Sequence, residues 1–145
     1  MIGLIVTGHG GFATGLASAL DILAGKPEKF ACVDFQQEDS TDDLEISLKK
    51  AIKSLDDCHG ILILADLVNA SPYKISSELS EKMHATHDIR VVCGTNMGML
   101  VQINMARGYV NDVNDLADLA VEEGRKHVLK YVYGDLPEKD SQEDR

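Results

Sequence analysis

Short, continuously apolar segments alternate along the chain with longer segments in which apolar residues recur every three or four positions. The apolar segments are Ile2 to Thr7, Phe30 to Phe35, Gly60 to Ala65 and Ile89 to Cys93. Runs of this length, apolar on both faces, are typical of parallel strands that helices cover on two sides. The alternation predicts a doubly wound α/β fold with a mainly parallel sheet.

Amphipathic segments of helical length lie between and after the predicted strands. Five segments share this spacing: Gly11 to Ala24, a segment from the capping residues 39–42 to Leu55, a segment that begins at Ser71, Met99 to Ala106, and Asn114 to Tyr131. Ser71 and Pro72 suit the N-cap and first helical position of the third helix. In the fifth helix we expect Val128 to face the core.

The chain length indicates one domain. With 145 residues, the chain can bury roughly two-thirds of its unfolded surface around a single core. We place this domain at residues 1–134. Residues 135–145 contain five acidic and two basic side chains and no apolar periodicity, so we expect an acidic, disordered tail.

Charge and cysteine content restrict the class of partner. The net charge of −10 argues against a surface for nucleic acid or anionic membranes, because phosphate groups require a basic face. No apolar run approaches the ~20 residues of a membrane span, and we expect neither membrane insertion nor a signal peptide. Cys32, Cys58 and Cys93 lack metal-type spacing, which predicts reduced thiols in a cytoplasmic protein.

The first predicted strand leads into a glycine-rich turn, Gly8 to Gly11, that holds His9. Ligands of an open parallel sheet bind at the carboxyl ends of its strands. His9 also lies at the amino end of a predicted helix, where free N–H groups, including those of Gly10 and Gly11, would suit an anion beside the ring. A histidine here can be a nucleophile, a general base or a metal ligand, or only a solvated residue.

Asp66 follows the third strand as His9 follows the first. Right-handed crossovers and a strand order of 2-1-3-4 would place these two strands side by side. A carboxylate facing the imidazole would fix its tautomer through one ring nitrogen and leave the other as a nucleophile. Ser71 could add donors for a phosphoryl oxygen, although Ser-Pro by itself is more often a plain helix start.

Several other chemistries are poorly supported. Histidines 59, 84, 87 and 127 lie in loops or on helix surfaces and make no credible metal set, so we expect no metal and no cofactor. The glycine-rich turn lacks both the GxGxxG spacing and the lysine of a phosphate loop. A histidine-type phosphatase would need an arginine beside His9, and the turn contains none.

Three motifs resemble one known family. They are Ile5 to Gly10, Ala65-Asp66 followed by Ser71-Pro72, and Gly94 to Leu100. Over residues 1 to about 131, the chain resembles the IIA component of the mannose-family phosphoenolpyruvate-dependent sugar phosphotransferase system (PTS). The resemblance implies that His9 accepts a phosphoryl group from the carrier HPr and passes it to a IIB subunit. It also implies that Asp66 orients His9 and that Ser71 lines the phosphate site.

The resemblance extends to assembly. It implies a homodimer, in family members with an exchanged edge strand, for which Tyr109 to Val113 and the region after Tyr131 are both candidates. The IIB acceptor should be a separate polypeptide, coupled to the IIC and IID membrane components. Partner docking should use an apolar rim, of which we expect two or three members to be exposed. The candidates are Phe12, Leu67, Val68, Tyr73, Met97 and Met99.

Two departures from the mannose-type pattern concern the sugar. The motif Thr-Trp-Gly-Gly between the aspartate and Ser-Pro is replaced by Leu67-Val68-Asn69-Ala70, and Gly98 stands where many members have proline. These changes point away from mannose, toward an N-acetylgalactosamine, gluconate, sorbose or fructose system. A phosphocarrier subunit of a dihydroxyacetone kinase and a non-catalytic regulatory α/β module stay open as alternatives.

Overall fold

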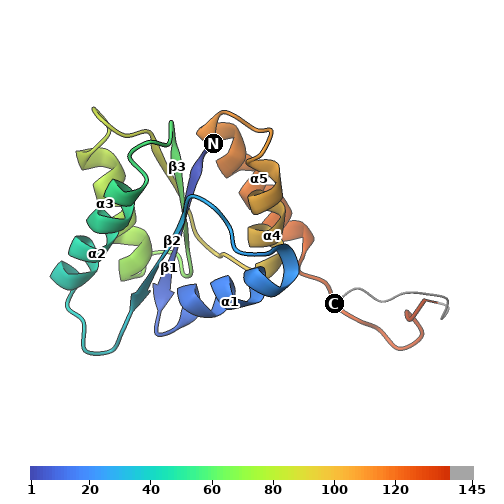
Figure 1. Cartoon of the computed structure of the whole chain (residues 1–145). Coiled ribbons are helices and arrows are strands. Elements are labelled where there is room, and N and C mark those ends of the chain that lie inside the picture. Colours follow the sequence, from blue (N-terminus) through green and yellow to red (C-terminus); the bar gives the residue numbers. More distant parts are fainter. Residues whose placement is uncertain (138–145) are drawn as a thin grey trace.

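Four parallel strands form the centre of the computed structural model, which describes residues 1–137 (Figure 1). They are β1 (Gly3–His9), β2 (Phe30–Phe35), β3 (Ile61–Ala65) and β4 (Ile89–Val92). Their order in the sheet is β2-β1-β3-β4, which confirms the predicted order. β1 therefore lies between β2 and β3, and β2 and β4 form the edges.

Helices cover both faces of this sheet. α2 and α3 lie on one face, and α1, α4 and α5 lie on the other (Figure 1). Their bounds are α1 (Phe12–Ala24), α2 (Thr41–Ser54), α3 (Ser71–Lys82), α4 (Met97–Ala106) and α5 (Val113–Lys126). The expectation of a doubly wound α/β fold is thus confirmed.

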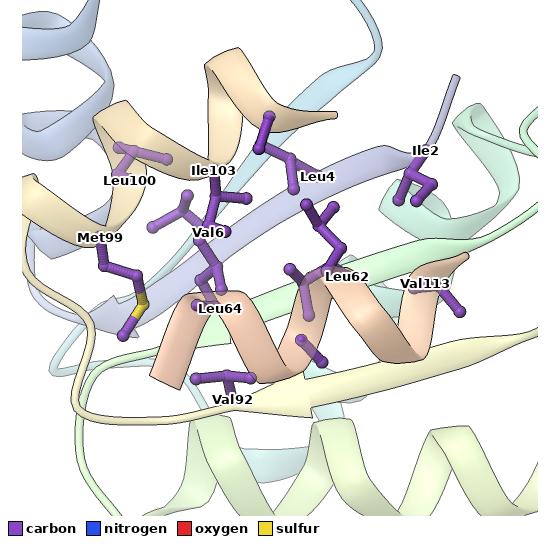
Figure 2. Close-up of a cluster of buried hydrophobic side chains, with 14 of the residues drawn as sticks. Ile2, Leu4, Val6, Leu62, Leu64, Val92, Met99, Leu100, Ile103 and Val113 are labelled. Atoms are coloured by element: carbon purple, nitrogen blue, oxygen red, sulfur yellow. The ribbon is translucent and has the colours of Figure 1, made fainter. Parts of the chain in front are cut away.

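Alternate residues of β1 face two separate cores. Leu4 and Val6 pack with α1, α4 and α5, whereas Ile5 packs with α2 and α3. Figure 2 shows the first core, where side chains of β1, β3 and α4 meet. Both faces of the strand are buried because helices cover both, which is why the sequence reads as a continuous apolar run rather than an alternating one.

Side-chain caps explain where three of the helices begin. Ser40 and Asp43 form a capping box at the start of α2, each side chain bonding the other's backbone N–H. Asn96 accepts from the N–H of Met99, so α4 begins at Met97 rather than at Met99 as predicted. Asp112 caps α5 in the same way.

The predicted extent of the fifth helix is wrong. α5 ends at Lys126, and Val128, expected to face the core, is 73% exposed. The apolar spacing does continue past Lys126, but Val128 and Leu129 lie outside the helix and are exposed. An N-cap at Ser71 is also wrong, because Ala70 occupies the N-cap of α3 and Ser71 is its first residue.

The exchanged strand stays a prediction. Residues 109–112 form a loop that leads into α5, which begins at Val113, and residues 127–137 contain no helix or strand. The predicted domain boundary at residue 134 also stays a prediction. Most of the predicted acidic tail, residues 138–145, lies outside the described residues.

Candidate functional site

His9 is the last residue of β1, at the carboxyl edge of the sheet. The sequence placed it one step beyond the strand, but the structure continues the pairing with β2, where His9 lies opposite Phe35. The His9 side chain is 47% exposed. A rigid strand therefore presents a ring that a partner molecule can reach.

Asp66, the first residue after β3, faces this ring. Its Oδ2 lies 2.6 Å from Nδ1 of His9 and also accepts the backbone N–H of His9 at 2.9 Å. Its Oδ1 accepts the N–H of Leu67 at 2.8 Å. The predicted juxtaposition of His9 and Asp66 is therefore present, and one carboxylate fixes both the ring and the end of the strand.

The surroundings of Asp66 favour its charged form. Partial burial alone would raise the pKa of the carboxyl, but hydrogen bonds from the His9 ring, the His9 backbone and the Leu67 backbone together hold the pKa below its ordinary value. An ionised carboxylate only accepts hydrogen bonds, so Nδ1 of His9 must carry the proton. In the neutral imidazole, the other ring nitrogen, Nε2, then carries the free lone pair.

Glycine at position 8 permits this close approach. A Cβ added to Gly8 would lie 3.0 Å from Cγ of Asp66 and 2.5 Å from Cδ1 of Phe12. Gly10 adopts φ +58, a backbone conformation that other residues rarely adopt. Gly8 is therefore needed for its small size, and Gly10 for its backbone conformation.

Phe35 is a site residue that the sequence reasoning missed. Its ring meets the His9 imidazole edge-on, with centroids 5.8 Å apart and planes at 63°. The contact limits rotation of the imidazole from the side opposite β3. The contact follows from the register between β1 and β2, which places His9 opposite Phe35. Apolar periodicity in the sequence does not specify that register.

Protein groups already occupy several N–H donors at the amino end of α1, where the sequence suggests an anion beside His9. The carboxylate of Asp34 accepts the N–H groups of Ala13 and Thr14 at 3.0 and 3.1 Å and the Thr14 hydroxyl at 2.7 Å. The N–H of Gly10 is also occupied, since it donates to the carbonyl of Phe35 at 2.8 Å. The N–H of Gly11 donates to no acceptor among residues 1–137, although its carbonyl accepts the N–H of Gly15 at 2.8 Å.

The amino end of α3 differs from the others. Its N-cap, Ala70, offers no side-chain acceptor, and its first turn contains no acidic residue. The Ser71 hydroxyl bonds to no other described residue. Asn69 adopts φ 62, which explains why glycine suits this position in the mannose-type pattern and why asparagine can replace it.

The six apolar docking candidates separate into three groups. Leu67 and Val68 are 60% and 61% exposed, in the loop directly after Asp66. Phe12, Tyr73 and Met97 are half-buried. Met99 is 2% exposed and points into the core in Figure 2, so its proposed place on a docking rim is wrong.

His127 accounts for glycine at position 98. A Cβ on Gly98 would overlap the Cβ and Cγ of His127, the C-cap residue of α5. The sequence reasoning treated His127 as simply solvated, but it packs against the first turn of α4. The family's proline and this histidine therefore cannot share the same space.

Fold and site together define a class: a doubly wound α/β domain with a carboxylate-paired histidine at the carboxyl edge of its sheet. Residues 3–121 match the family model EIIA-man, described as "PTS system fructose IIA component". The chain belongs to this family, which confirms the resemblance found in the sequence. Among residues 1–137, no helix has the length and apolar character that crossing a bilayer requires.

Individual relatives agree with this assignment. The chain is 30% identical, over 88% of its length, to the mannose-specific EIIAB component of Escherichia coli K12, and it spans 38% of that relative. It is 22% identical to the fructose-specific EIIA component of Bacillus subtilis, covering 76% of this chain and 73% of the relative.

Solved structures agree as well. An EIIA component from Streptococcus agalactiae matches with a TM-score of 0.83 and 29% identity, over 90% of this chain and 97% of that one. A mannose/sorbose IIA subunit from Enterococcus faecalis matches with a TM-score of 0.79 and 25% identity, over 95% and 98% of the two chains.

Proposed function

We propose that the chain is a phosphocarrier of a phosphoenolpyruvate-dependent sugar phosphotransferase system. His9 accepts a phosphoryl group from phosphorylated HPr and passes it to a IIB subunit. The observation that carries this proposal is the 2.6 Å contact between Nδ1 of His9 and Oδ2 of Asp66 beneath an exposed ring. Membership of the IIA family supports it.

The chemistry follows from the tautomer. The lone pair on Nε2 of His9 attacks the phosphorus of the donor phosphohistidine, a new P–N bond forms, and the donor's P–N bond breaks with its electrons returning to the donor ring. Nδ1 keeps its proton, so the phosphorylated imidazole of His9 becomes formally cationic. The negative charge on Asp66 stabilises that cation, and transfer to the IIB subunit reverses the same steps.

The phosphoryl oxygens need donors near Nε2. With the amino end of α1 occupied by Asp34, the available groups are Ser71, the uncapped first turn of α3 and the N–H of Gly11. Gly10 contributes its backbone conformation rather than a donor. We therefore assign phosphate binding mainly to Ser71, with the N–H of Gly11 as a further donor.

Both partners need to reach the same edge of the sheet. Leu67 and Val68 offer exposed apolar surface next to Asp66, and we propose that HPr and the IIB subunit dock on them in turn. The acceptor works together with IIC and IID membrane components, which select the sugar. The proposal therefore names sugar transport as a class and no particular sugar.

We also propose that two copies associate. β4 is an edge strand, and its outer side pairs with no other strand among residues 1–137. A groove of about 500 Å³ lies beside it, lined by residues of β4 and α5. The described segment after α5 exposes six large apolar side chains that a second chain could cover: Val128, Leu129, Tyr131, Val132, Tyr133 and Leu136.

The proposed function is tested by incubation with phosphoenolpyruvate, enzyme I and HPr, followed by intact-mass measurement. We expect wild type to gain one phosphoryl group, labile in acid and attached to Nε2 by NMR. The His9→Ala variant should gain none, and His84→Ala, which changes an exposed histidine in the loop after α3, should behave as wild type. No incorporation into folded wild type would contradict the proposal.

The acceptor distinguishes the remaining alternatives. Phosphorylated chain mixed with a IIB subunit should lose its phosphoryl group to it. Transfer only to a dihydroxyacetone kinase would instead identify the kinase phosphocarrier. Full activity of a partner assembly with His9→Ala would identify a non-catalytic regulatory module.

A further inference from the structure

Thr95 forms two hydrogen bonds to the end of β3. It lies in the loop between β4 and α4, and it is 8% exposed. Its hydroxyl donates to the carbonyl of Ala65 at 2.7 Å, and its N–H donates to the same oxygen at 3.2 Å. Ala65 is the last residue of β3, immediately before Asp66.

Gly94 forms a hydrogen bond to the next carbonyl along the chain, that of Asp66. Its N–H donates to the carbonyl of Asp66 at 2.9 Å, and its φ of +74 gives the loop the turn that this contact needs. The paired register of β3 and β4 ends at Leu64 and Val92. The loop therefore continues the hydrogen bonding of the sheet at the point where the chain leaves β3. At this point the Asp66 side chain contacts His9.

The loop is itself fixed at its far end. The side chain of Asn96 accepts the N–H of Met99 at 2.9 Å and donates to the carbonyl of Gly124 at 3.0 Å. It thereby joins the start of α4 to α5. Thr95 precedes Asn96, whose position is fixed by these two bonds. The hydrogen bond from the Thr95 hydroxyl therefore restrains the backbone at Ala65 and Asp66.

We propose that Thr95 is a positioning residue for phosphoryl transfer: its hydroxyl bond to Ala65 sets the place from which Asp66 contacts His9. The inference rests on the proposed function. The Asp66 carboxylate must satisfy donors from His9 and Leu67 at once, which leaves little freedom for the backbone that carries it. Displacements on the order of 1 Å near a reacting group can cost a hundredfold in rate.

The test compares Thr95→Val with Thr95→Ser. Valine keeps the shape and removes the hydroxyl, and serine restores it. Thr86→Val is the matched control, because Thr86 also donates its hydroxyl to a backbone carbonyl, that of Met83, but lies in the loop before β4. We expect phosphoryl transfer from HPr to slow on the order of tenfold in Thr95→Val and to stay at the wild-type rate in the other two.

Two further readouts separate positioning from simple destabilisation. In Thr95→Val we expect the Nδ1 proton of His9 to shift upfield in NMR spectra and the pKa of Asp66 to rise, because the hydrogen bond between them lengthens. Thr95→Ser and Thr86→Val should change neither. A loss of stability alone would leave both signals of the folded molecules in place.

The outcomes are distinct. If wild type takes up no phosphoryl group, the proposed function has failed. If wild type is phosphorylated and Thr95→Val matches it in rate and in both signals, the positioning role is overturned. If Thr95→Val does not fold, Thr95→Ala removes the same hydroxyl and is expected to show the same loss. Failure of both to fold, with Thr95→Ser folded, would mark Thr95 as structural and overturn the proposal.

Discussion

One oxygen of Asp66 accepts both the ring Nδ1–H and the backbone N–H of His9, at 2.6 and 2.9 Å. The two residues are 57 positions apart in sequence and lie at the ends of adjacent parallel strands. A single carboxylate therefore sets the tautomer of the imidazole and the position of its backbone together.

Asp66→Asn should fold but transfer phosphoryl groups on the order of tenfold to a hundredfold more slowly. Asparagine has one side-chain oxygen, so it cannot accept from both His9 and Leu67 as the carboxylate does, and it carries no charge to balance a phosphorylated ring. Rapid-quench measurement in both directions would show this. Asp57→Asn, an exposed control in the turn before β3, at the other end of that strand from Asp66, should match wild type, and unchanged rates in Asp66→Asn would refute the role.

Acid should weaken the protein partly through Asp66. Its pKa is lower in the folded chain than the ordinary 3.8, so the folded state favours the ionised carboxylate. The resulting stabilisation is complete above that ordinary value and is lost as the pH falls through the lowered pKa. In urea unfolding between pH 7 and pH 2.5, the gap between wild type and Asp66→Asn should shrink on acidification. A gap that widens would contradict the assigned shift.

Gly8→Ala should disturb the pair sterically. The added methyl group would meet Phe12 at 2.5 Å and Asp66 at 3.0 Å, so we expect slower transfer and a lower melting temperature. Gly15→Ala is the control: Gly15 lies within α1 with open space around it, and alanine there should stabilise by roughly 0.5–1 kcal/mol. Wild-type transfer in Gly8→Ala would show that Asp66 has room to move.

Arg107→Met should destabilise the fold and leave phosphoryl transfer intact. Arg107 is 3% exposed and donates to the carbonyls of Ile2 at 3.0 Å and Lys29 at 2.9 Å, and to that of Glu28. Losing these donors should cost about 3 kcal/mol or more in the free energy of unfolding, measured by denaturant titration.

The matched control for this experiment is Arg90→Met, which removes a partly exposed ion pair with Asp88. Such pairs contribute about 0–1 kcal/mol. Arg107 acts at the amino ends of β1 and β2, opposite His9, so its loss should spare transfer. An equal cost for the two variants would contradict a special role for Arg107.

Gly98 and His127 should behave as a coupled pair. Gly98→Ala places a methyl group where His127 already packs, and the overlap should cost about 1–3 kcal/mol in the free energy of unfolding. Removing the ring with His127→Ala should reduce that cost when the two changes are combined. A double-mutant cycle measures this coupling, and strictly additive effects would refute the contact.

The sequence predicted His9 and Asp66 as a pair because strand order alone brings the ends of β1 and β3 together. It could not predict Phe35 or Asp34, because their contacts depend on the register of β2 and on side-chain direction. Leu67 and Met99 were equivalent as apolar candidates, yet one is exposed and the other buried. Residue type does not distinguish a surface apolar side chain from a core one.

By itself the sequence determined the alternation of strands and helices, the sheet order and the two residues whose chemistry defines the site. Those features follow from local periodicity and from the handedness of βαβ connections, which act over short stretches of chain. Only the tertiary structure decided that Asp34 accepts N–H groups at the amino end of α1, that α5 ends at Lys126 and that Thr95 donates to the carbonyl of Ala65, next to Asp66. Each of these depends on which groups from distant segments meet, and competition among neighbours for the same hydrogen bonds and space has no local signal in the sequence.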